Sequence, residues 1–322
     1  MFAVEGGAQT ASVDSKRFLN PNADFTQVGL SEERLGEAQN ALASYDTTGD
    51  EKDLVVAVLL MTMAGYQNTL AQYERLLVLN QQMLNISERR YGPEHEITAL
   101  SLTNLAHTHS ALSQFDKALA LNLRAFSSIT KAYGAESVSA AQSMNMLASS
   151  YQALAQYDKA LNLNMRALTI IERALGPDSL EAAQCLTHLA STYTYIARFD
   201  EALSANQRVL VINEKLLGQD HAVTMGTVNS LAVIHRALGQ YREALLLDQR
   251  ALEYMERAHS PTHPSIVFSL QNLATTYVYL AQYEKALILQ NRATAIAEAS
   301  LGPNHRDTAS TLAALVSAPI EY

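Results

Sequence analysis

Histidines are the first residues of this chain whose types and spacing suggest chemistry, because imidazole nitrogens are common zinc ligands. Four of them follow short segments that contain Gly or Pro: His95, His221, His263 and His305. The last three are separated by a constant 42-residue step and His95 lies three such steps before His221, so a 42-residue structural unit would place each histidine in a different unit. Each unit adds two helix packings of roughly 8 to 10 Å, too far for one ion with nitrogen ligands near 2 Å. His107 and His109 are two residues apart in a predicted helix and face different sides. The sequence therefore predicts no metal site and no cofactor.

Motifs of known enzyme classes are missing as well. The chain has no Gly-rich phosphate loop, no His-Glu-x-x-His pair and no Gly-x-Ser-x-Gly elbow. Ser, His and Asp are plentiful, but residues that recur on a repeated surface are weak evidence for a catalytic triad. We expect that the protein is not an enzyme, and an enzyme in its own right is the least favoured alternative.

Charge and cysteine content narrow the class of partner. The net charge of -9 lacks the basic footprint of a nucleic-acid binder and opposes docking on anionic lipid, so we expect neither nucleic acid nor membrane as a partner. Cys185 is the only cysteine, which excludes an intrachain disulfide and indicates a small buried apolar group in a reducing compartment. No signal peptide and no 18-residue apolar stretch is recognisable, so the protein is predicted to be soluble and cytoplasmic.

A repeated hexamer organises the chain. Residues 156–161 read QYDKAL, and the aromatic member of this hexamer returns at a constant 42-residue interval without an insertion. It stands at Tyr73, Phe115, Tyr157, Phe199, Tyr241 and Tyr283. Such regular spacing predicts a repeat array, which folds as one elongated solenoid rather than as separate globular domains.

Each unit contains two helical patterns and a helix stop. The first helix is predicted over residues such as 96–111 and the second over residues such as 115–133. A glycine then stands where a helix end needs the left-handed conformation: Gly92, Gly134, Gly176, Gly218 and Gly302. Ser260 replaces this glycine in one loop, so we expect a different helix end there. Without any strand signal, the chain is predicted to be all-α.

Small and large apolar residues recur at fixed places in both helices. The first helices carry Leu-Ala pairs at 105–106, 147–148, 189–190, 231–232 and 273–274. The second helices carry Ala118, Ala160, Ala202, Ala244 and Ala286. Alanine lets neighbouring helices approach closely while the adjacent leucine fills the groove, so both sets are predicted to be buried.

The period also sets the expected domain boundaries. We predict a flexible N-terminal arm over residues 1–28, a degenerate capping helix over 29–51, the repeat array over 52–316 and a tail over 317–322. Junctions between units fall near residues 94, 136, 178, 220, 262 and 304. The helix predicted over 305–316 either caps the array or continues it in a longer protein.

These features resemble the tetratricopeptide repeat. The resemblance rests on the Leu-Ala pair, on an aromatic residue three positions later at Tyr151, Tyr193 and Tyr277, and on the Ala-rich second helix. The 42-residue period and loops such as LGPDS are similar to the kinesin-light-chain type of this repeat. The resemblance covers roughly residues 52–316 and implies a right-handed α-solenoid that serves as a protein-binding scaffold. Histidine replaces the aromatic residue in two units, and no heptad segment precedes the array, so we do not expect a motor subunit.

The resemblance also implies a binding site, because the first helices of such arrays line the concave surface. The matching residues are Asn104, His107, Asn145, Ser149, Gln152, Thr187, His188, Tyr195, Asn229, Arg236, Asn272 and Tyr279. This lining is polar with a single cation, Arg236, so a clamp of Lys and Arg for a C-terminal carboxylate is not expected. Its amides and hydroxyls can bind the backbone of an extended peptide or a partner helix, while tyrosine offers flat apolar contact. The alternative is a solvated surface with binding through edges or loops.

One further column runs along the second helices: Arg124, Arg166, Arg208, Arg250 and Arg292. A basic stripe for nucleic acid is conceivable, but Glu172, Glu214, Glu256 and Glu298 form an acidic column on the same helices. We expect the arginine stems to cover the core and their heads to contact polar groups of a neighbouring repeat.

The sequence thus predicts a non-catalytic scaffold that binds a peptide segment or a partner protein in the groove of the array. The alternative is a regulatory or sensor module that controls a catalytic partner, such as a protease or nuclease, through a ligand-dependent change of the array. The identity of the partner and the oligomeric state are not predicted.

Overall fold

A computed structural model describes residues 40, 41, 43, 44 and 70–301. The contacts divide the chain into two units, residues 1–83 and 84–322, which are described separately. In the first unit, residues 40, 41, 43 and 44 are helical, and helix α4 (Leu70–Tyr91) begins there and continues into the second unit. The predicted N-terminal arm, most of the capping helix, Gly302, the helix over 305–316 and the tail lie outside the described residues.

The second unit is a succession of helix pairs. They are α5 (Glu96–Ala111), α6 (Phe115–Tyr133), α7 (Val138–Ala153), α8 (Tyr157–Leu175), α9 (Leu180–Tyr195), α10 (Phe199–Leu216), α11 (Ala222–Ala237), α12 (Tyr241–Ala258), α13 (Ile266–Tyr279) and α14 (Tyr283–Leu301). The predicted helices 96–111 and 115–133 agree with α5 and α6 at both ends. No strand occurs among the described residues, which confirms the all-α helical repeat array.

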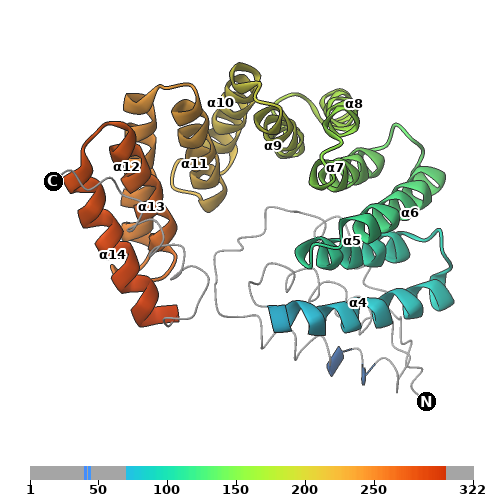
Figure 1. The fold of residues 1–322 in the computed structure, drawn as a ribbon. Coiled ribbons are helices and arrows are strands. Elements are labelled where there is room, and N and C mark those ends of the chain that lie inside the picture. The colour runs from blue at the N-terminus through green and yellow to red at the C-terminus, as the bar shows by residue number, and fades with distance from the viewer. Residues whose placement is uncertain (1–39, 42, 45–69, 302–322) are drawn as a thin grey trace, which may run out of the picture. The chain divides into compact units, whose positions relative to one another are not determined.

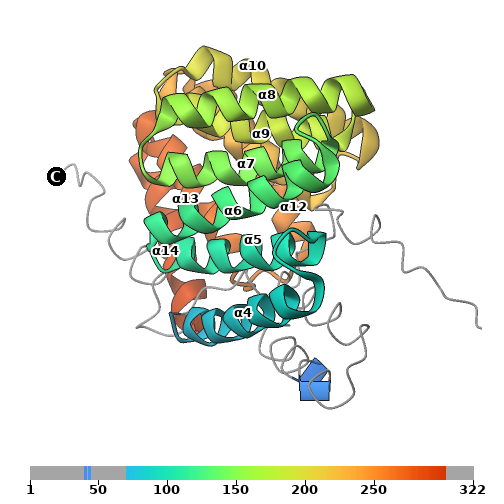
Figure 2. The ribbon, with the colours of Figure 1, turned by 90° about the vertical axis from the view of Figure 1, so that its right-hand side faces the viewer.

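Within the second unit the helices form two layers (Figures 1 and 2). The first helices α5, α7, α9, α11 and α13 make up the first-helix layer, and α6, α8, α10, α12 and α14 make up the second-helix layer. Each helix packs against the next helix along the chain. Equivalent residues of successive repeats therefore recur along one layer.

The histidines considered as metal ligands take part in helix starts. The Nδ1 atoms of His95 and His221 accept hydrogen bonds of 3.2 Å from the backbone N–H groups of Ile97 and Val223, at the starts of α5 and α11. His263 accepts in the same way from Ser265 N in the turn before α13, at 3.2 Å. Side-chain acceptors at these positions satisfy backbone N–H groups that the helix itself leaves unpaired.

The loop glycines adopt positive φ as predicted, but not the left-handed helical conformation. At Gly134 φ is 85° and ψ is 153°, and at Gly176 the angles are 92° and 157°. This extended region at positive φ is open almost only to glycine, so the backbone leaves the helix in a direction that other residues disfavour. Helix α12, which lacks the glycine, ends instead on an extended His259 with φ of -133°.

The turn between the two helices of a repeat uses a second residue with positive φ. Ser113, Ala155, Ala197 and Ala281 have φ between 53° and 58°, and Gly239 has φ of 72° at the equivalent position. In the turn after α7, Gln156 N donates to Tyr151 O at 2.8 Å and Ala155 N donates to Gln152 O at 2.9 Å. This pair of bonds closes the helix end with a residue in the left-handed region, where alanine is strained and glycine is not.

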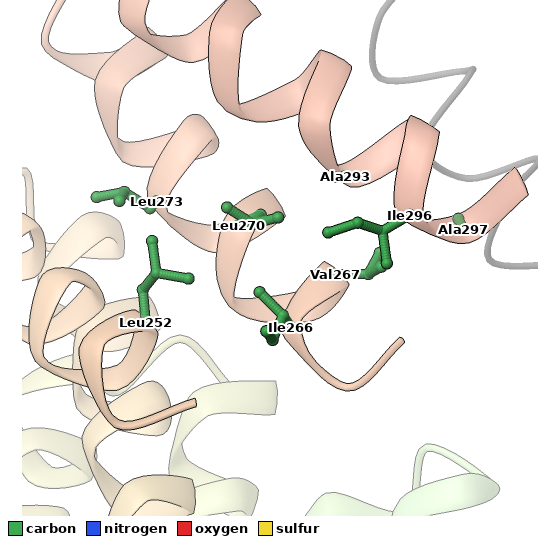
Figure 3. Packing of buried hydrophobic residues seen from close by; sticks show 8 residues of the cluster. All are labelled: Leu252, Ile266, Val267, Leu270, Leu273, Ala293, Ile296 and Ala297. Carbon is green, nitrogen blue, oxygen red and sulfur yellow. The ribbon is translucent and has the colours of Figure 1, made fainter. Parts of the chain in front are cut away.

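The core follows the predicted columns. The Leu-Ala pairs of the first helices and the alanines of the second helices are all buried. Figure 3 shows one such cluster between α12, α13 and α14, in which Ile266, Leu270 and Ala293 are fully buried. Because each cluster joins neighbouring helices only, stability is distributed along the array rather than concentrated in one core.

Candidate partner-binding surface

The arginine column of the second-helix layer joins neighbouring repeats through ion pairs. The pairs are Arg124–Glu88, Arg166–Glu136, Arg208–Glu172, Arg250–Glu214 and Arg292–Glu256, at 2.5 to 3.0 Å. Arg166 departs from the 36-residue spacing of the other pairs because Thr130 occupies the place of the glutamate. The prediction that the heads contact polar groups of a neighbouring repeat is confirmed, and these arginines do not form an unpaired basic stripe.

Buried hydrogen bonds connect the second helices α6 and α8 to the first helix of the next repeat. Asn122 Nδ2 donates to Ser150 Oγ at 2.8 Å, and Asn164 Nδ2 donates to Thr192 Oγ1 at 2.8 Å. Gln152, a predicted binding residue, also donates to Thr192 Oγ1, at 2.7 Å. Its amide is therefore engaged within the layer, between α7 and α9.

A charged version of the same network lies between α11, α12 and α13. Asp248 Oδ2 accepts from Arg236 Nη1 at 2.7 Å and from the Thr276 hydroxyl at 2.5 Å, while Arg236 Nη2 reaches Asn272 Oδ1 at 3.4 Å. The two charged side chains are 9% and 0% exposed. Burial raises the pKa of Asp248, an effect that the Thr276 hydroxyl and the Arg236 guanidinium oppose. Arg236 is thus an internal counter-ion, not a free cation for a ligand.

The predicted binding residues divide by exposure. His107, Thr187, Tyr195 and Tyr279 are exposed. Ser149, Gln152, His188, Asn229, Arg236 and Asn272 are partly buried. Asn104 and Asn145 are buried, and Asn145 Nδ2 donates to the Cys185 sulfur at 3.1 Å. These last two side chains support the first-helix layer from inside.

The two histidines of this set favour the neutral form. Burial lowers the pKa of His188 to about 4, and desolvation by packed neighbouring atoms lowers the pKa of His107 although part of that side chain is exposed. At neutral pH both rings are therefore uncharged hydrogen-bonding groups, since desolvation disfavours the imidazolium ion.

Each of the two exposed tyrosines is stacked on the aromatic residue of a repeated hexamer. The rings of Tyr157 and Tyr195 are 5.8 Å apart with an interplanar angle of 14°, and those of Tyr241 and Tyr279 are 5.0 Å apart with an angle of 10°. Tyr195 remains 63% exposed and Tyr279 54% exposed. The hexamer aromatics were not predicted to contribute to this surface, although the 38-residue spacing common to both pairs is readable in the sequence.

Charge is distributed unequally between the two layers. The exposed residues of α5, α7, α9, α11 and α13 include no Asp, Glu, Lys or Arg. Exposed ion pairs such as Arg173–Glu136 and Lys215–Asp178 instead involve the second helices and the loops. The exposed surface of the first-helix layer therefore offers uncharged polar groups and aromatic rings.

The described residues contain no group of three or more His, Cys, Asp or Glu side chains placed to hold a metal ion. No helix in the described ranges is long and apolar enough to cross a membrane.

Comparison with known proteins gives a consistent result for fold. A family model described as tetratricopeptide repeat matches residues 55–131, 105–170, 137–215 and 222–299. A putative kinesin light chain from Podosopora anserina with nearly identical TPR-like repeats shares 25% identity at a TM-score of 0.57, covering 64% of this chain and 98% of its own. BtubC (BKLC) from P. vanneervenii shares 20% identity at a TM-score of 0.61, covering 74% and 96%. A Rap protein crystallised with Competence and Sporulation Factor shares 16% identity at a TM-score of 0.52, covering 89% and 87%. No curated protein matched by sequence.

Proposed function

Because this chain belongs to the tetratricopeptide repeat family, we propose that it is a non-catalytic module that binds a protein or peptide segment on its first-helix layer. Members of such repeat families present extended surfaces built from many equivalent positions. The proposal concerns the exposed side chains of α5, α7, α9, α11 and α13 and extends to no reaction.

The observation that carries the proposal is the uncharged character of this layer in an acidic chain. The chain has a net charge of -9. The exposed positions of five first helices nevertheless include no Asp, Glu, Lys or Arg, which distinguishes them from the rest of the described surface. The exposed hydroxyls of Thr187, Ser230 and Thr275 donate to carbonyl groups of their own helices, so their oxygens can accept hydrogen bonds from the N–H groups of a peptide backbone. Burying uncharged groups against a partner avoids the desolvation cost of burying charges.

Similar structures support binding as the kind of activity. The Rap protein was crystallised in complex with Competence and Sporulation Factor, so a protein with this fold holds another molecule. At 16% identity the similarity supports the fold alone and carries no residue of that site to this chain.

The test introduces charge on one layer at a time. Thr187→Glu, Ser230→Glu and Thr275→Glu together place carboxylates at exposed first-helix positions, and Asn162→Glu, Ser204→Glu and Asn291→Glu do the same on the second-helix layer as the control. Affinity capture from the native cells with quantitative mass spectrometry should show at least one partner that the wild type and the control retain and that the first-helix variant loses at least tenfold. Equal capture by all three proteins would contradict the proposal.

A regulatory role is the second candidate, and a break in the buried network favours it. Asn206, the equivalent of Asn164, has Ile234 where the other repeats have Ser150, Thr192 and Thr276, and its Nδ2 donates to Ala202 O at 3.3 Å instead. Asn206 thus lacks the bond to the next first helix that Asn164 and Asp248 make, although Asn213 Nδ2 on α10 still donates to Thr227 Oγ1 on α11 at 3.1 Å. A ligand that changes the array would meet weaker polar pairing at the position of Asn206 than at its equivalents. The variant Ile234→Thr, which offers Asn206 a hydroxyl partner, tests this role by hydrogen exchange at the α10–α11 junction.

A further inference from the structure

Two histidine rings stack in the loop between α12 and α13. The ring centres of His259 and His263 are 4.5 Å apart, and the ring planes differ by 12°. His259 directly follows the last residue of α12. His263 Nδ1 accepts a hydrogen bond of 3.2 Å from Ser265 N, so this ring also holds the backbone that leads into α13. The stack therefore connects the end of one helix with the start of the next.

Other repeat junctions among the described residues have at most one histidine at these two places. The corresponding pairs are Tyr91–His95, Tyr133–Ser137, Leu175–Ser179 and Leu217–His221. Tyr91 and His95 stack in the same manner, with ring centres 4.7 Å apart. Ser137 holds the helix start with a hydroxyl oxygen, which accepts from Ala140 N at 3.1 Å. The chain thus contains the same junction with two, one or no imidazole rings.

Charged groups around the stack have partners of their own. Arg257 of α12 pairs with Asp220 in the loop before α11, and the histidine of that loop caps α11. Arg292 of α14 pairs with Glu256 of α12, and its Nη2 donates to Pro261 O at 3.2 Å. Helix α13 carries no Asp, Glu, Lys, Arg or His. Within the described ranges neither imidazole of the stack forms an ion pair with a carboxylate, so a proton on one ring has no acidic partner there.

From this arrangement we propose that the α12–α13 loop is an acid-sensitive junction, which the neutral histidine stack closes and which opens when the rings take up protons. Protonation at His263 Nδ1 turns the acceptor of the Ser265 N–H group into a donor, so this hydrogen bond is lost. Protonation of both rings places two like charges 4.5 Å apart, and these repel each other. Because Arg292 donates to Pro261 O, an open loop also loses a contact with α14. This device goes beyond the proposed function and does not depend on it.

The direction of the pH effect follows from the preference for the neutral form. Desolvation, together with the neighbouring His263 ring, lowers the pKa of His259 from its ordinary value of 6.5. A histidine whose pKa is lower in the folded protein contributes fully to stability above its ordinary pKa and loses this contribution as the pH falls. The junction should therefore be closed at pH 7.5 and should open progressively below about pH 6.5.

The test is hydrogen exchange of the full chain at pH 7.5 and pH 5.5, measured by mass spectrometry. Protection factors are compared, since they correct for the pH dependence of exchange itself. Residues 265–270 at the start of α13 are matched with residues 139–144 of α7, whose junction has Tyr133 and Ser137 in place of the two histidines. Acidification should lower the protection of residues 265–270 at least fivefold more than that of residues 139–144. An equal change at both junctions would overturn the proposal, and this comparison needs no substitution.

Two substitutions then identify the histidines as the cause. His259→Tyr copies the Tyr91–His95 stack and removes one imidazole, and adding His263→Ser copies the junction before α7. The loss of protection on acidification should become smaller in the single variant and should disappear in the double variant. His221→Ser, at the junction before α11, is the control and should leave the pH response of residues 265–270 unchanged. A double variant that keeps the full response would also refute the proposal.

Discussion

Exchanging the buried ion pair between α11 and α12 for its neutral counterpart should leave the array nearly as stable as before, although each single exchange should damage it. Gln152 and Asn164 stand two repeats before Arg236 and Asp248, and both donate to Thr192 as the charged pair engages Thr276. The double variant Arg236→Gln with Asp248→Asn therefore copies a network that the chain already contains.

The magnitudes follow from burial. With 9% and 0% of the two side chains exposed, removing one partner of the pair leaves a charge that water reaches poorly. Breaking a buried pair from one side costs about 3 to 5 kcal/mol. Arg236→Gln should cost about 3 kcal/mol, the low end, because the Thr276 hydroxyl stays on the carboxylate. Asp248→Asn should cost about 2 kcal/mol, since the long arginine side chain can turn its head toward water. The double variant should lie within about 1 kcal/mol of the wild type, since replacing a whole buried pair is often neutral.

The assay is urea unfolding followed by circular dichroism at pH 7.5, with hydrogen exchange of α11, α12 and α13 measured by mass spectrometry. Exchange is needed because a repeat array can open locally without unfolding as a whole. The two single losses sum to about 5 kcal/mol, so the coupling between the sites should be about 4 kcal/mol or more. A double variant as unstable as that sum would refute the reasoning, because the two side chains would then act independently.

Three further outcomes are expected. Ala155→Gly should raise the free energy of unfolding by up to about 1 kcal/mol in thermal unfolding, because φ is 55° at this position. The matched variant Gly239→Ala should lower it. A loss of stability in Ala155→Gly would contradict the positive φ of this turn. The pKa of His188 is about 4 in the folded protein, below the ordinary value of 6.5. The neutral ring therefore contributes fully to the free energy of unfolding above pH 6.5. This contribution, at most roughly 3 kcal/mol, is lost as the pH falls toward 4. The variant His188→Asn should accordingly show a smaller fall in melting temperature between pH 7.5 and 5 than the wild type. Ile234→Thr should supply Asn206 with the missing hydroxyl partner and slow hydrogen exchange at the α10–α11 junction; unchanged exchange would count against a hinge there.

The fold could be predicted from the sequence because packing repeats with the period. Ala202 and its equivalents are buried because the same two helices meet in every repeat. One 42-residue pattern was therefore enough to predict where α5 and α6 begin and end. The dihedral angles of Gly134 were less predictable, since a positive φ can be inferred from glycine but ψ depends on where the loop leads.

The candidate site was less accessible because exposure depends on contacts between repeats. Asn145 and Tyr195 both occupy first-helix positions, yet one contacts a buried sulfur while the other lies largely in solvent. The family pattern identifies the layer but not which side chains turn toward the next helix. Arg236 was predicted to line the binding surface as its single cation, because its counter-ion, Asp248, belongs to another helix and aligns with asparagine in the preceding repeats.

These features also alternate with a period of two repeats. Gln152 and Arg236 stand two repeats apart and each contacts the next first helix, and the stacks formed by Tyr195 and Tyr279 have the same separation. Thr194 on α9 occupies the place between Gln152 and Arg236, and Ala237 on α11 occupies the place between the two tyrosines, so the two alternations fall on different repeats. Packing within a repeat has no need for alternation, because the Leu and Ala columns are the same in every unit. The two tyrosines, unlike Gln152 and Arg236, are exposed, so their alternation is accessible to a ligand that contacts every second unit.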